Sequence, residues 1–140
     1  MSRRLVRETA LQSLFQMDVG QIPVSEAIHN VLEEASPAVD QTYLRKIVTG
    51  TYDHLSVIDP LIKKYSVGWE LERMPSVDLA VLRMAVYELL FEPDVPPKVV
   101  VNEAVELAKS FSTAESGKFV NGILGKVLND LDQLRSSCIP

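Results

Sequence analysis

The longest apolar stretch of the chain, residues 76–92, is apolar on every side rather than along one stripe. A helix of this kind has to be surrounded by other elements. Pro75 and Ser76 predict its start, with Ser76 as the N-cap and Asp78 in the first turn, and Pro93 follows its end. We therefore expect a buried helix over 76–92 around which the other elements pack.

Elsewhere, apolar residues recur at spacings of three and four, the period of amphipathic helices. Three further helices are predicted over residues 3–18, 25–36 and 97–111. Another is capped by Asp40, and the next begins at Asp59 and Pro60 and ends near Gly68. The last follows the capping box Ser112–Glu115 and runs through Leu134. Three consecutive valines at 99–101 alone suggest a strand, but the spacing that continues to Phe111 favours a helix. The pattern predicts an all-α fold of about seven helices.

Length and composition indicate one folded domain. The chain has 140 residues, of which 46% are hydrophobic and 24% charged. Residues 67–75 predict a hinge between an N-terminal part, about 1–68, and a C-terminal part, about 69–140. No run is long and apolar enough for a membrane span or a signal core, and Cys138 is the single cysteine, so we expect a cytoplasmic protein without disulfides.

Positive charge is concentrated at the start of the chain, although the net charge is −5. The first seven residues contain Arg3, Arg4 and Arg7 and no acid. On a helical wheel Arg4, Arg7, Leu11 and Phe15 share a sector about 80° wide, so that basic charge alternates with an aromatic ring. The pattern is typical of a contact with RNA, the arginines meeting phosphates and the ring stacking on a base. Taken alone, it favours the alternative of a solvated helix end, because three arginines make a small patch.

Other polar residues give no sign of catalysis. His29 and His54 lie on separate helices, which predicts no metal site, and no serine or cysteine lies in a nucleophile motif. Arg83, inside the apolar helix, is expected to pair with a carboxylate such as Glu103. Gly122 and Gly125 form a flat face of the last helix, for which close packing within the chain and approach by another backbone both stay open.

Several motifs together resemble the family of the bacterial transcription antitermination factor NusB. They span essentially the whole chain in order: Arg3-Arg4-x-x-Arg7-Glu8-x-Ala10-Leu11-Gln12-x-Leu14-Phe15, Trp69-x-Leu71-x-Arg73, Val77-Asp78-x-x-x-Leu82-Arg83-x-Ala85-x-Tyr87-Glu88-Leu89, Asn102-Glu103-Ala104-x-Glu106-Leu107-Ala108-Lys109 and Ser116-x-Lys118-Phe119-Val120-Asn121-Gly122.

The resemblance implies two small helical sub-bundles, no catalytic activity and no cofactor. It implies pairing with a small-subunit ribosomal protein, called NusE in this role, on the boxA RNA of nascent ribosomal RNA transcripts, where the complex helps RNA polymerase in the elongation complex read through terminators. The RNA-facing residues would be Arg3, Arg4, Arg7, Gln12 and Phe15, with a second region at Lys118 and Phe119; Asp78 and Glu115 would face the partner. Phe15 stands where many members of the family have tyrosine, so base stacking is kept and a phenol hydrogen bond is lost.

Two other interpretations remain beside this one. The chain can be a helical protein-interaction or homodimerisation module that binds RNA only incidentally. It also resembles the NusB-like domain of rRNA cytosine methyltransferases, which we disfavour because the chain ends at Pro140 without a cofactor-binding fold.

Overall fold

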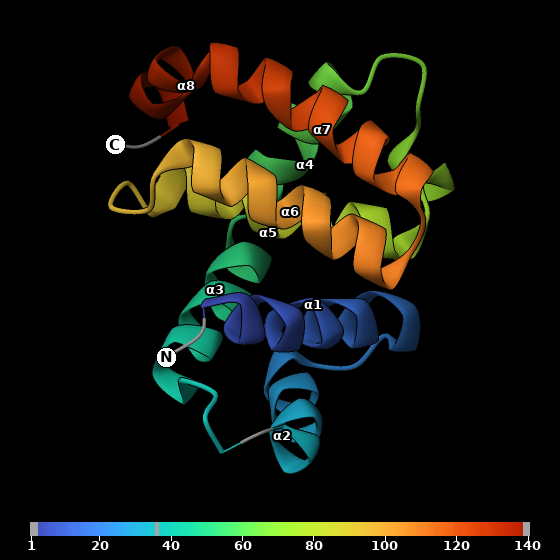
Figure 1. Ribbon diagram of the computed structural model, residues 1–140, viewed down its shortest axis with the longest axis vertical. Helices are drawn as coiled ribbons and strands as arrows, with labels where there is room; N and C mark the ends of the chain where they lie inside the picture. The colour runs from blue at the N-terminus through green and yellow to red at the C-terminus, as the bar shows by residue number, and fades with distance from the viewer. Residues whose placement is uncertain (1–2, 36, 139–140) are drawn as a thin grey trace.

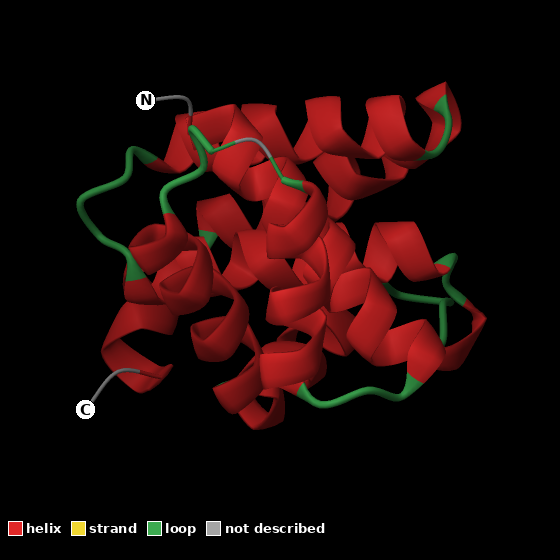
Figure 2. Ribbon diagram, turned by 90° about the horizontal axis from the view of Figure 1, so that it is seen from below, coloured by secondary structure: helices red, strands yellow, loops and turns green. Residues whose placement is uncertain are grey.

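The computed structural model describes residues 3–35 and 37–138 and, of these, every side chain except those of Arg3 and Cys138. The regular elements of this part of the chain are all helices, joined by loops, and it contains no strand (Figures 1 and 2), so the all-α prediction is confirmed. The elements are α1 (Arg3–Gly20), α2 (Val24–Glu34), α3 (Gln41–Asp53), α4 (Leu55–Tyr65), the 3₁₀ turn η1 (Leu71–Arg73), α5 (Ser76–Phe91), α6 (Pro97–Phe111), α7 (Ala114–Asn129) and α8 (Leu131–Cys138).

Helix α5 is enclosed along most of its length. Every residue from 78 to 90 except Arg83 is buried, and the helix packs against α1, α3, α4, α6, α7 and α8. Figure 1 shows α5 behind α6, between α1 and α7. Ser76 is the first residue of the helix and not its N-cap. Pro75 takes the N-cap position, and no side chain makes a capping hydrogen bond there.

The remaining helices gather on two sides of α5. Helices α1, α2 and α3 pack against one another on one side, and α6 and α7 lie side by side on the other (Figure 1). Helix α3 starts as its sequence signal predicts, because the carboxylate of Asp40 accepts a hydrogen bond from the backbone N–H of Tyr43 at 3.1 Å. The capping signal of α7 is shifted by one residue: Thr113 rather than Ser112 is the N-cap, and its hydroxyl accepts a hydrogen bond from the backbone N–H of Ser116 at 3.1 Å.

Helix α4 begins earlier than its sequence signal predicts. The N–H of His54 closes the last turn of α3, and α4 starts at the next residue, Leu55. Pro60 therefore lies inside the helix rather than at its first position. Proline has no N–H to donate to the carbonyl of Ser56, four residues earlier. Both Pro60 and Ser56 are exposed. Water can solvate that carbonyl, which makes the proline tolerable.

Asp59 does not cap a helix because its carboxylate binds Arg83 of α5. The guanidinium donates through Nε and Nη2 to the two oxygens of Asp59, both at 2.9 Å, and its Nη1 lies 3.7 Å from Asp18. The expectation that Arg83 pairs with a carboxylate holds, but the suggested partner, Glu103, is wrong.

The predicted last helix is divided in two at Asp130. The Tyr65 hydroxyl donates a 2.6 Å hydrogen bond to Asp130, and this bond together with burial raises the pKa of Tyr65 to about 12. Helix α8 then begins at Leu131, and Nε of Arg135 donates to the carbonyl of Leu89 at 2.9 Å. These two bonds fix the break and hold α8 against the core.

Two glycines have opposite surroundings. A Cβ atom on Gly50 would overlap the ring of Tyr87, so the contact between α3 and α5 requires glycine there. On α7, a Cβ atom on Gly122 or Gly125 would meet nothing within 4 Å. The face of α7 that carries these two glycines is therefore open.

None of the helices in the described ranges is long and apolar enough to cross a lipid bilayer.

Candidate nucleic-acid interface

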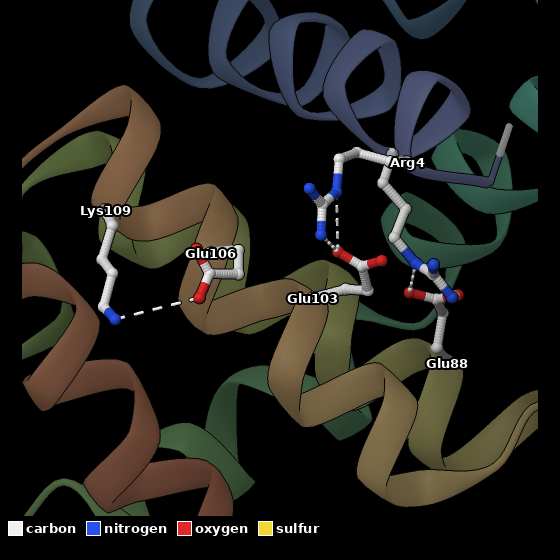
Figure 3. A network of polar contacts seen from close by, with 6 residues as sticks. Arg4, Glu88, Glu103, Glu106 and Lys109 are labelled. Carbon is white, nitrogen blue, oxygen red and sulfur yellow. Dashed lines mark hydrogen bonds and ion pairs between the residues drawn. The ribbon is translucent and has the colours of Figure 1, made fainter.

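Arg4 keeps an exposed positive charge at the start of α1. Its side chain is 57% exposed, and its Nε and Nη2 atoms donate to one oxygen of Glu103 on α6 at 3.0 and 2.9 Å (Figure 3). An ion pair this exposed contributes little to stability and can be exchanged for another anion. Arg3 belongs to the same turn, but its side chain lies outside the described residues.

Arg7 points into the core. It is 2% exposed, and its guanidinium makes three hydrogen bonds of 2.9 to 3.2 Å with both oxygens of Glu88, which is 1% exposed. Burial alone would lower the pKa of Arg7, but the hydrogen bonds and charge of Glu88 raise it overall, so the arginine stays charged. Arg7 shares a sector of the helical wheel with Phe15, but the expectation that it meets a phosphate does not fit this structure, in which its guanidinium is buried against Glu88.

Phe15 and Gln12 lie on the exposed side of α1, beside a hollow that we call the Phe15 hollow. Phe15 is 37% exposed, whereas Leu11 from the same wheel sector is 2% exposed. The hollow has a volume of about 430 Å³ and is lined by Leu11, Gln12, Phe15, Gln16, Val31, Glu34, Val77 and Phe111. The exposed ring of Phe15 can stack on a flat group such as a base.

A second hollow, which we call the Trp69 pocket, lies between the segment before α5 and the start of α7. Its volume is about 610 Å³, and it is lined by Trp69, Arg73, Pro75, Asp78, Thr113, Glu115, Ser116, Lys118 and Phe119. The rings of Trp69 and Phe119 meet edge to face, with centroids 5.3 Å apart. The side chains of Glu115 and Lys118 are 84% and 77% exposed and 3.6 Å apart. The pocket thus combines aromatic rings with charged groups of both signs.

Asp78 lines this pocket but is almost completely buried. It is 3% exposed, and its Oδ1 atom has no hydrogen-bond partner among the described residues. Burial raises the pKa of Asp78, and a hydrogen bond with Ser116 offsets part of that rise. A group that brings a donor into the pocket would therefore remove an unfavourable feature of the fold.

The two hollows are neighbours. The Phe15 hollow is bounded by Val77 and Phe111, and the Trp69 pocket by Asp78, which follows Val77, and by Thr113, which is two residues after Phe111. The residues predicted on α1, Gln12 and Phe15, and those predicted near the start of α7 therefore line two hollows that are bounded by the same two stretches of chain. The sequence did not indicate that Trp69 belongs to this surface or that Asp78 is buried beneath it.

Comparison with known proteins agrees with the motifs. The model of the NusB family matches residues 4–129. The chain belongs to the NusB family. The transcription antitermination protein NusB of Symbiobacterium thermophilum is 49% identical over 140 residues, which cover 94% of this chain and 92% of that protein.

Two solved NusB structures have the same fold. T. maritima NusB has a TM-score of 0.81 and 37% identity, covering all of this chain and 94% of that one. A complex of antitermination factors NusB and NusE with double-stranded RNA contains a chain with a TM-score of 0.83 and 29% identity, covering 91% of this chain and 96% of that one. In that complex, a NusB fold is found together with both NusE and RNA.

Within the described ranges, no group of three or more His, Cys, Asp and Glu side chains is arranged to hold a metal ion.

Proposed function

We propose that this chain is a transcription antitermination factor that pairs with the ribosomal protein NusE on boxA RNA of nascent ribosomal RNA transcripts. Acting in the cytoplasm as part of the transcription elongation complex, it promotes read-through by RNA polymerase and catalyses no reaction. Family membership supports this proposal. The observation that carries it is the pair of hollows, both lined by aromatic rings, of which the Trp69 pocket is also lined by Arg73 and Lys118.

The RNA-facing surface combines charge with stacking. Arg4, together with Arg3, supplies positive charge at the start of α1, and the open ring of Phe15 supplies a stacking surface beside Gln12. Lys118 and Phe119 form the second contact at the start of α7. Arg7 leaves this set because its charge is matched inside the core by Glu88. Its effect on RNA binding is indirect, because its pair with Glu88 holds α1 in place.

A basic partner fits the remaining features. The chain has a net charge of −5, and few of its basic groups lie at the proposed site, so RNA binding by the chain alone should be weak. Glu115 is exposed at the mouth of the Trp69 pocket, and Asp78 has an unpaired oxygen beneath it. We assign these two carboxylates to the partner, which can bring basic side chains to them.

Salt titrations of RNA binding, with the partner present, test the two kinds of contact separately. Each phosphate contact to single-stranded RNA contributes about 0.7 to the slope of log K against log salt, so Arg4→Ala should reduce the slope by about that amount. Phe15→Ala removes no charge and should weaken binding by about 1 to 3 kcal/mol at an unchanged slope. Arg45→Ala, an exposed arginine of α3 outside the site, is the matched control. Equal affinities and slopes in all variants would exclude this surface.

A homodimerising module is the second candidate function, and one observation favours it. Gly122 and Gly125 leave the face of α7 open, so that another backbone can approach closely. Sedimentation of the chain alone and of Gly122→Leu would decide between the two. A dimer that the substitution dissociates while RNA binding is unchanged would favour the module.

A further inference from the structure

Trp69 is the single tryptophan of the chain, and none of the roles assigned so far uses it. It is 51% exposed, although burying an indole ring ordinarily stabilises a fold considerably. The ring is braced by its edge-to-face contact with Phe119, at 62° between the ring planes. A large aromatic surface is thus held in a defined orientation and left half open to solvent.

Two exposed cations line the pocket with Trp69. The side chain of Arg73 is 80% exposed and that of Lys118 is 77% exposed. Each has an acidic neighbour three residues earlier in the chain, Glu70 and Glu115 respectively, at 3.6 Å. Such exposed pairs contribute little, so both cations can move to a phosphate at small cost.

The position of the pocket extends the surface that begins at Phe15. Phe111, which is 39% exposed, lines the Phe15 hollow two residues before Thr113 of the Trp69 pocket. Phe15 and Phe111 thus line one hollow, and Trp69 lines the pocket that begins two residues further along the chain. Aromatic side chains in a row beside positive charge are the arrangement by which proteins hold single-stranded nucleic acid.

We propose that Trp69 is a base-stacking residue: one unpaired base of the RNA lies on its open ring, and Arg73 and Lys118 bind the phosphates that flank this base. The inference rests on the proposed RNA-binding function and extends it by a further stacking position beside Phe15. The pocket of about 610 Å³ is in the range of sites that enclose small molecules, so a nucleobase can enter it. A base has a π face whatever its identity, so this position adds affinity more than sequence preference.

The first experiment uses the fluorescence of Trp69. Because no other tryptophan is present, its emission reports on this pocket alone, and Trp69→Phe supplies the background signal of the ribosomal partner. The chain is first saturated with the partner and then titrated with a single-stranded boxA-type RNA. We expect the emission to be quenched in proportion to the RNA bound. Quenching that is complete on addition of the partner alone would overturn the proposal, because a protein side chain would then occupy the ring.

Affinity measurements on the same complex are the second experiment. Trp69→Ala should weaken RNA binding about 5- to 150-fold at an unchanged salt slope, whereas Trp69→Phe should retain most of the affinity. Arg73→Ala should reduce the slope by about 0.7. Val67→Ala, in the same segment and 81% exposed, is the control and should change neither quantity. Thermal melting of each variant verifies that it is folded.

The outcomes separate this inference from the function on which it rests. If Trp69→Ala binds RNA as tightly as the wild type while Arg4→Ala and Phe15→Ala bind more weakly, the strand does not reach Trp69 and only this inference fails. If none of these variants differs from the wild type, the proposed function fails as well.

Discussion

Two carboxylates are buried in α5, one near each end, and their surroundings are opposite. Glu88 accepts three hydrogen bonds from Arg7, and the pair is sealed in the core. Asp78 forms no ion pair among the described residues and keeps one unpaired oxygen at the Trp69 pocket. A buried charge is costly unless it is matched. The first carboxylate therefore stabilises the fold, and the second is the one that we propose is met by a group outside the chain.

The largest effect is expected from breaking the matched pair. Arg7→Ala leaves Glu88 buried and uncompensated, which should lower the free energy of unfolding by about 3 to 5 kcal/mol. Urea denaturation measures the loss. Arg4→Ala, which removes the exposed pair with Glu103, is the control and should cost no more than about 1 kcal/mol.

The double variant Arg7→Met with Glu88→Leu sharpens the interpretation. It removes both charges together, so it should recover most of the stability lost in Arg7→Ala. Equal losses for Arg7→Ala and Arg4→Ala would contradict the assignment of Arg7 to the core.

A smaller loss should follow from Gly50→Ala, because the α5 end that contains Glu88 is also tightly packed. The added methyl group overlaps the ring of Tyr87, and overpacking of this kind costs about 1 to 3 kcal/mol. Gly122→Ala is the same chemical change in open space and should stabilise the helix by about 1 kcal/mol. Chemical denaturation of the two variants should therefore show shifts of opposite sign; a loss in Gly122→Ala would instead point to a contact on that face.

The smallest effect concerns Asp78 and depends on pH. Burial raises its pKa in the folded chain above the unfolded value, so the folded state binds more protons in that window and stability falls as the pH rises through it. Asp78→Asn has no such charge. It should be more stable than the wild type at neutral pH, by less than the loss in Arg7→Ala, and the difference should shrink as the pH falls toward about 4. Denaturation midpoints between these pH values test this, and a less stable variant at neutral pH would mean that the charge is matched.

The periodicity of apolar residues predicted the helices well because each helix must bury a stripe of its own surface. The prediction of helix ends failed where a side chain is bound by a residue far away in the sequence. The signal Asp59-Pro60 predicted a helix start, but Asp59 is held by Arg83 of α5, and α4 begins five residues before Pro60, at Leu55. The break at Asp130 likewise depends on Tyr65, which is 65 residues away in the chain.

The candidate site was predicted in part for the same reason. A helical wheel places Arg7 at the edge of the apolar stripe, and whether such a residue turns inward depends on what faces it. The clue in the sequence was Glu88, an acid without an evident partner in a helix that is apolar on all sides. The exposed positions of Phe15 and Lys118 agree with the prediction, but their contacts with RNA stay a prediction. So does the division of the fold into two sub-bundles.

The inward position of Arg7 also affects how fast a ligand is captured. Because Glu88 cancels its charge within the core, the arginine contributes nothing to the long-range field, and an approaching polyanion meets the field of a chain with a net charge of −5. Encounter rates should then be slow for the free chain and should rise once a basic protein has bound it. Assembly is expected to be ordered in time, with the protein partner first and the nucleic acid second.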